Sequence, residues 1–165
     1  MAVITIGGVA KEYAIGTTFE QIAQEYQEQY NNTIALITEN GKIRELHKKV
    51  SKDADIKFIT LSDAIGHKTY ERSAIMLFVK AVHDIIGKDI RIKVEFSIGK
   101  GLYCAILGDK KLDDDSIKQI NHRMNDLVAA NIPITKRPYP IAEAVALFKK
   151  QGMEDNVDLF SYRRR

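Results

Sequence analysis

The chain has 165 residues and a formal net charge of +3, from 25 lysines and arginines against 22 aspartates and glutamates. Its hydrophobic share of 45% and charged share of 28% are typical of a globular protein and exclude a disordered chain. The last three residues, Arg163 to Arg165, supply the whole positive excess. The rest of the chain has no net charge, whereas a dedicated nucleic-acid-binding protein is usually positively charged over its folded part.

Simple sequence patterns argue against membrane, secreted and cysteine-rich proteins. No run of about 18 apolar residues occurs, so we expect no membrane span and no membrane partner. The N-terminus lacks a basic segment followed by an apolar one, which argues against a secretory signal. The single cysteine, Cys104, excludes an internal disulfide and a cysteine-rich zinc site. We therefore expect a soluble cytoplasmic protein, with Cys104 either a small strand residue or a reactive thiol.

Residues 1–63 begin with a predicted hairpin. Ala2–Ile6 is rich in β-branched residues and ends at Gly7-Gly8, and Val9–Ile15 follows as the partner strand. Apolar runs predict three later strands, the first two joined by the turn Asn40-Gly41: Thr33–Thr38, Lys42–Leu46 and Asp55–Leu61.

One helix is predicted between these strands. Thr17 or Thr18 is expected to cap it, with Glu20 or Gln21 as the capping-box partner. Its buried stripe follows helical spacing: Phe19, Ile22, Ala23 and Tyr26. Two strands, one helix and then more strands is the order of a β-grasp fold, in which the helix covers one face of a mixed sheet.

The second part predicts a further α+β unit. A long helix over Lys68–Ile86 is followed by a hairpin, in which Ile90, Ile92, Val94 and Phe96 alternate as a buried face. The turn Gly99-Lys-Gly101 leads into a strand over Leu102–Leu107. The remaining predicted elements are a helix over Asp115–Asn131, an edge strand over Ile132–Tyr139 interrupted by prolines, and a helix from Pro140 to Gln151.

The two parts differ in charge, which supports a domain boundary between them. Residues 1–63 carry 7 basic and 9 acidic residues, a net −2, whereas residues 64–165 carry 18 and 13, a net +5. No long linker separates them. We predict an α+β protein with a β-grasp domain at 1–63 and a second α+β domain at 67–165.

The first domain resembles a TGS domain, the small β-grasp module at the N-terminus of threonyl-tRNA synthetases and of some GTPases. The resemblance rests on Ala2–Ile6, Thr18–Ala23 and Asp53–Ile59. The second domain resembles the one that follows TGS in those synthetases, the second additional domain shared with alanyl-tRNA synthetases. The residues that carry it are Ser73–Val82, Gly101–Tyr103, Asp115–Asn131, Tyr139–Ala144, Phe148 and Gly152.

In that family the second domain edits mischarged tRNA, with a His-x-x-x-His pair on its first helix and a later Cys-x-x-x-His. Two imidazoles four residues apart share one helical face, which suits metal coordination or activation of water. This sequence has Thr69 and Ser73 at the aligned positions, and Cys104 is followed by no nearby histidine. A shifted alignment gives His67 and Glu71. The only catalytic candidates are therefore His67, Glu71 and Cys104, and we expect no bound metal.

The same domain pair also occurs fused to a uridine-kinase-like P-loop domain. Tyr70–Ser73 and Phe160–Arg164 are more similar to that group. The loop Gly-x-x-x-x-Gly-Lys-Ser/Thr, which holds phosphates, does not occur here. The leading interpretation is a non-catalytic ligand- or RNA-binding or regulatory N-terminal region of a nucleoside kinase, truncated before its kinase domain. That domain would be its partner and would use ATP and magnesium, while this chain would need no cofactor.

Two alternatives stay open. One is a fragment related to threonyl-tRNA synthetases that binds tRNA or deacylates mischarged tRNA. The other is simple RNA binding by the positive second domain. Candidate contacts to RNA or phosphate are Arg72, Lys80, Arg91 and Lys100, although these residues would also suit a mixed solvated surface. His122 lies among polar residues and is expected to be solvated.

Overall fold

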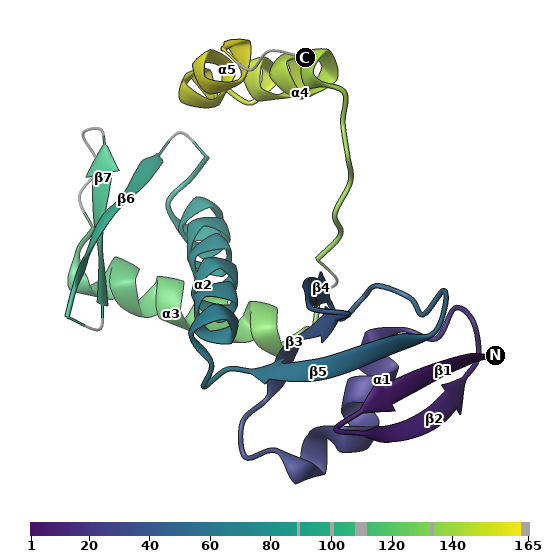
Figure 1. Ribbon diagram of the computed structural model, residues 1–165. Coiled ribbons are helices and arrows are strands. Elements are labelled where there is room, and N and C mark those ends of the chain that lie inside the picture. The colour runs from purple at the N-terminus through teal and green to yellow at the C-terminus, as the bar shows by residue number, and fades with distance from the viewer. Residues whose placement is uncertain (89, 100, 108–111, 133, 163–165) are drawn as a thin grey trace. The chain divides into compact units, whose positions relative to one another are not determined.

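The computed structural model describes residues 1–88, 90–99, 101–107, 112–132 and 134–162. It has the predicted α+β class (Figure 1), and it divides into compact units at 1–129 and 130–165. Within the first unit, two separate buried clusters form, one on each side of the boundary expected near residue 63. The division into domains 1–63 and 67–165 stays a prediction. No helix in the described ranges is long and apolar enough to cross a membrane.

The N-terminal part is a five-stranded mixed sheet with one helix. Its strands are β1 (Ala2–Ile6), β2 (Val9–Tyr13), β3 (Ile34–Glu39), β4 (Lys42–Glu45) and β5 (Ala54–Thr60). Their order is β2-β1-β5-β3-β4, with β1 and β5 parallel and the other pairs antiparallel. The helix α1 (Phe19–Tyr26) lies across one face of this sheet (Figure 1) and continues into a short 3-10 turn, η1 (Gln27–Gln29). This is the predicted β-grasp arrangement.

The core of this part is formed by α1 and the strands that it covers. Phe19 and Ile22 of α1 pack among Ile4, Ile37 and Ile56, and all five are at most 1% exposed. Thr18 is the capping residue: its hydroxyl accepts from the backbone N–H of Gln21 at 3.2 Å, and the Gln21 side chain accepts from the Thr18 N–H at 3.0 Å. The predicted capping box and apolar stripe are therefore confirmed.

The second part of the first unit contains two helices and a hairpin. Its elements are α2 (Ala64–Ile85), β6 (Arg91–Ile98), β7 (Gly101–Leu107) and α3 (Asp114–Ala129). Ala81 and Val82 of α2 pack against Ile120 and Leu127 of α3, and the hairpin adds half-buried residues to this second core. The helix α2 begins four residues before the predicted start. Gly66 lies in its first turn.

The predicted buried face of β6 is wrong at Phe96, which is 55% exposed. Val94 pairs with Cys104 but Phe96 pairs with Tyr103, so Glu95 is an extra residue in β6. Such a bulge interrupts the two-residue alternation and moves every later side chain to the other face. Ile92 and Val94 before it are half-buried as predicted. Phe96 after it lies on the outer face.

The second unit contains α4 (Ile141–Lys150) and α5 (Glu154–Ser161). Gly152, with a φ of +69°, lies between them, and Phe148 stacks on Phe160 with ring centroids 5.5 Å apart. The helix α5 is not among the elements predicted from the sequence. The edge strand predicted over Ile132–Tyr139 is also wrong, because the described residues of that segment form no strand. Prolines lack the N–H that a sheet ladder needs, which favours an extended connection here.

Candidate nucleic-acid interface

Most of the predicted site residues lie on α2. His67 and Glu71 are one turn apart, with His67 exposed and Glu71 partly buried. Thr69 and Ser73, at the positions of the family's histidines, are also one turn apart. The Thr69 hydroxyl donates to the backbone carbonyl of Ile65 at 2.9 Å, and the Ser73 hydroxyl donates to that of Thr69 at 3.1 Å. Both hydroxyls therefore bond to the helix that carries them.

Cys104 lies on β7, on the inner face of the hairpin and opposite Val94. Its thiol is half-buried and lies 4.0 Å from the backbone carbonyl oxygen of Leu102. Among the residues described by the structure, no group of three or more His, Cys, Asp or Glu is arranged to hold a metal ion. The structure thus does not bring His67, Glu71 and Cys104 together as a metal site, and their catalytic roles stay predictions.

The candidate RNA contacts that the structure describes are dispersed. Arg72 is exposed on α2, Arg91 is exposed at the start of β6, and Lys100 lies outside the described residues. Lys80, further along α2, forms an ion pair with Asp84 one turn later. Lys80 belongs to a larger charged cluster.

That cluster joins α2 to α3 through Asp84. One carboxylate oxygen of Asp84 pairs with Lys80, and the other lies 2.9 Å from the Arg123 guanidinium of α3. The Arg123 Nε also donates to this second oxygen at 3.0 Å. Hydrogen bonds from Lys80 and then Arg123 lower the pKa of Asp84. The carboxylate is therefore held ionised between two cations.

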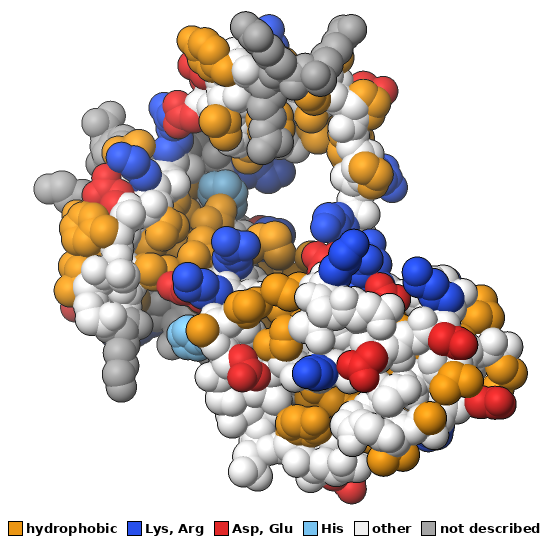
Figure 2. Space-filling view, in the orientation of Figure 1, with side chains coloured by type: hydrophobic (Ala, Val, Ile, Leu, Met, Phe, Trp, Pro, Cys, Tyr) orange, Lys and Arg blue, Asp and Glu red, His pale blue; other side chains and the backbone are white. Residues whose placement is uncertain are grey.

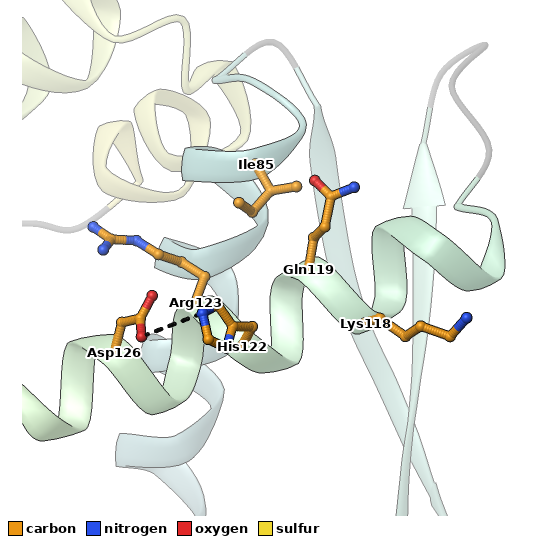
Figure 3. A pocket seen from close by; sticks show the side chains of 6 residues that line it. All are labelled: Ile85, Lys118, Gln119, His122, Arg123 and Asp126. Atoms are coloured by element: carbon orange, nitrogen blue, oxygen red, sulfur yellow. Dashed lines mark ion pairs between the residues drawn. The ribbon is translucent and has the colours of Figure 1, made fainter.

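Beside this cluster is a pocket of about 360 Å³ between the two helices (Figure 3). Ile85 of α2 forms one wall, and the other lining residues come from α3: Lys118, Gln119, His122, Arg123 and Asp126. His122 Nε2 lies 3.7 Å from an oxygen of Asp126, one helical turn away. We call Lys80, Lys118, His122 and Arg123 the α2–α3 surface.

The α2–α3 surface presents basic side chains beside the pocket that Ile85 helps to line. Lys118 pairs with Asp115 at 3.1 Å, but both side chains are more than three-quarters exposed, so water screens this pair and it exchanges easily. The His122 side chain is 82% exposed, which agrees with its predicted solvation. Exposed lysine, arginine and histidine donors are suited to contacts with phosphate oxygens and other anions.

Sequence reasoning missed three of these four residues. Lys118 and His122 are four residues apart on a predicted helix, so their shared face was available as a signal. The link from Arg123 to Asp84 spans 39 residues and depends on how two helices cross. No local pattern contains that information.

No known family model matches the chain. It is similar to threonine–tRNA ligase 1 of Bacillus subtilis, with 28% identity over 152 residues, 92% of this chain and 24% of the relative. It is also similar to the threonine–tRNA ligase of Desulforamulus reducens, with 25% identity over 93% of this chain and 24% of the relative. The threonine–tRNA ligase of Thermotoga petrophila is 26% identical over 87% of this chain and 22% of the relative. The chain spans about a quarter of the length of the curated relatives it matches.

These relatives correct the leading interpretation from the sequence. The expected regulatory region of a uridine-kinase-like nucleoside kinase is wrong, because nearly the whole chain matches threonine–tRNA ligases. The expected partner, a kinase domain, has no support in the relatives, and the expected ATP and magnesium applied only to such a kinase. The resemblance to threonyl-tRNA synthetases is confirmed, because more than 90% of this chain is similar to one region of those enzymes.

Proposed function

We propose that this chain is a tRNA-binding region related to threonyl-tRNA synthetases, and that it contacts the tRNA backbone through the α2–α3 surface. The observation that carries the proposal is the clustering of Lys80, Lys118 and Arg123 across two helices, in a chain that is similar to threonine–tRNA ligases. Phosphate contacts from lysine and arginine supply most of the sequence-independent affinity for nucleic acid.

The charge distribution supports this placement. The region from residue 64 onward has a net charge of +5, of which Arg163 to Arg165 supply three, against −2 for residues 1–63. Binding is therefore expected to depend on the region from residue 64 onward more than on the β-grasp part. Because the contacts are electrostatic, affinity falls steeply as the salt concentration rises.

The proposed role is binding without deacylation. The hydroxyls of Thr69 and Ser73 are already hydrogen-bonded to the α2 backbone, which leaves them poorly suited to activate water. We expect no chain-dependent hydrolysis of an aminoacylated or mischarged threonine tRNA. Turnover above the spontaneous rate would contradict this part of the proposal.

The test is filter binding of a threonine tRNA transcript over a series of salt concentrations. For wild type we expect the logarithm of the association constant to fall linearly with the logarithm of the salt concentration. Lys118→Gln is expected to weaken binding and to reduce the magnitude of that slope by about 1, the value for one lost phosphate contact.

Lys57→Gln is the matched control. Lys57 is an exposed lysine on β5 that is not part of the proposed surface, and its loss removes the same charge. Equal effects of the two substitutions would mean that only net charge matters and would contradict the proposed surface. No binding by wild type at low salt would contradict tRNA binding itself.

A further inference from the structure

The β6–β7 hairpin has a second, outward face that the α2–α3 surface does not use. The inner face contributes Ile92 and Ile106 to the second core. The opposite face carries Phe96, Ile98 and Tyr103, which are 55%, 61% and 46% exposed. Figure 2 shows hydrophobic side chains over the hairpin, at the left of the view. We call Lys93, Phe96, Ile98 and Tyr103 the hairpin outer face.

Two aromatic rings form the centre of the hairpin outer face. Phe96 and Tyr103 are directly opposite each other across the two strands. Their ring centroids are 5.1 Å apart and their planes differ by 24°, so the rings are stacked. Because about half of each residue is exposed, the pair presents a flat aromatic surface on which a further planar group can stack.

The bulge at Glu95 places Phe96 on this face. Without the extra residue, the alternation of β6 would put Phe96 on the inner face with Ile92 and Val94. The bulge therefore exposes an aromatic ring that would otherwise face the second core. Bulges that re-aim a side chain are over-represented beside functional sites.

The charge beside the rings indicates what kind of planar group would bind. Lys93 lies on the same face, and its side chain is 63% exposed. Its ion pair with Glu95 at 3.1 Å is at the surface and therefore weak, so the ammonium group can move to another anion. An aromatic platform next to a lysine matches a polymer with flat bases and a phosphate backbone, the pattern of single-strand binders.

We propose that the hairpin outer face stacks unpaired bases of single-stranded RNA. The inference rests on the proposed tRNA binding and extends it by naming the part of the RNA: unpaired nucleotides, whose bases have free faces. Bases inside a duplex already stack on their neighbours and offer no face to Phe96 or Tyr103. The hairpin would thus favour single-stranded over double-stranded RNA, and the α2–α3 surface would contact the RNA backbone.

The probe is a single-stranded RNA of about 8 nucleotides, within the site sizes typical of such binders, carrying one 2-aminopurine. Stacking on an aromatic ring quenches the fluorescence of this base. With wild type we expect saturable quenching, and much weaker quenching for the same strand in a duplex. Phe96→Ala and Tyr103→Ala are each expected to lower affinity for the single strand about fivefold to hundredfold.

A conservative variant and a variant outside both surfaces distinguish loss of stacking from loss of folding. Tyr103→Phe keeps the ring and is expected to retain the quenching. Val128→Ala removes a side chain of α3 that is 64% exposed and lies on neither proposed surface, so it serves as the matched control. Circular dichroism and thermal unfolding establish that each variant folds. Loss of quenching in both alanine variants, with retention in Tyr103→Phe, supports the platform.

Other outcomes overturn the inference and are distinguishable from failure of tRNA binding. If the oligonucleotide binds equally well to the alanine variants, the platform is wrong, while filter binding of tRNA still tests the α2–α3 surface. The same conclusion follows if wild type does not bind the oligonucleotide at low salt. Self-association of wild type that Tyr103→Ala abolishes, seen by sedimentation without RNA quenching, would instead assign the face to a second copy of this chain.

Discussion

Gly66 and Thr60 touch where the sheet passes into α2: a Cβ atom on Gly66 would lie 2.0 Å from the backbone oxygen of Thr60 and 2.8 Å from its carbonyl carbon. Thr60 ends β5, and its side chain is buried. Its N–H donates to a carboxylate oxygen of Asp63 at 2.7 Å, and its hydroxyl donates to the same oxygen at 3.0 Å. The junction is therefore closely packed and hydrogen-bonded, as expected where no long linker separates the two parts.

Gly66→Ala is expected to lower the free energy of unfolding by about 1–3 kcal/mol, the usual cost of overpacking. In an unobstructed helix the same change would stabilise the protein by roughly 0.4–1 kcal/mol, so the sign of the effect reports on the contact with Thr60. Urea unfolding followed by circular dichroism measures it. Gly101→Ala is the control, because its added Cβ would meet Ile98 O at an ordinary 3.7 Å.

Thr18→Ala is expected to destabilise the β-grasp part by about 1 kcal/mol. The substitution removes the hydroxyl that accepts from the Gln21 N–H at the start of α1. Thr17→Ala is the matched control, because Thr18, and not Thr17, has the capping hydrogen bonds. Thermal unfolding of the two variants should differ by several degrees in Tm. Equal losses would contradict the assignment of Thr18 as the cap.

Glu25 is expected to make the stability of the chain depend on pH in the acid range. A hydrogen bond from Lys11 at 2.6 Å, with a further one from Tyr13 at 3.0 Å, lowers the pKa of the Glu25 carboxyl. A lowered pKa in the folded state stabilises the protein above the ordinary pKa of glutamate, about 4.3. That contribution is lost as the pH falls through the folded-state value.

Unfolding midpoints in urea, measured between pH 7 and pH 3, test this expectation. Glu25→Gln should show a smaller loss of stability across this range than wild type, because glutamine does not titrate. Glu28→Gln, at an exposed position of the following turn, serves as the control. An unchanged pH dependence in Glu25→Gln would show that the cluster of Lys11, Tyr13 and Glu25 contributes nothing measurable.

Asp84→Asn is expected to have opposite effects on stability and on tRNA affinity. Losing the carboxylate between Lys80 and Arg123 should cost about 0.5–1 kcal/mol of stability, as for other surface ion pairs. It also leaves both cations available for phosphate and removes a negative charge, so affinity for tRNA at low salt should rise a few-fold. Thermal unfolding and filter binding measure the two effects.

Asp55→Asn, at an exposed position of β5, removes the same charge far along the chain from the α2–α3 surface. It is expected to change tRNA affinity less than Asp84→Asn does. A decrease in affinity for Asp84→Asn in a folded protein would argue that Asp84 orients Arg123 toward the RNA and does not compete with it.

Local signals in the sequence were sufficient for most of the β-grasp part. Gly7-Gly8 and Asn40-Gly41 marked its turns, and helical spacing identified Phe19 and Ile22 as core residues. The capping box limited the helix start to Thr17 or Thr18, and the structure has Thr18. Each of these signals lies within a few neighbouring residues, where backbone preferences decide the conformation.

The errors lie where distant residues decide the structure. The start of α2 was placed four residues too late, and Gly66 in its first turn is needed for the contact with Thr60. Phe96 was placed in the core because a bulge has no sequence signature of its own. The pairing of Asp84 with Arg123 depends on how α2 and α3 cross, so the charged cluster was not foreseeable from α2 alone.

The bulge at Glu95 also affects how related sequences are to be read. Since the extra residue decides which side of the ribbon Phe96 occupies, that side is encoded in the number of residues between Val94 and the turn, and not in their identities. Two relatives with the same aromatic residues but a one-residue gap at this point would present them on opposite sides. In this hairpin, a gap in an alignment carries more structural information than a matched residue.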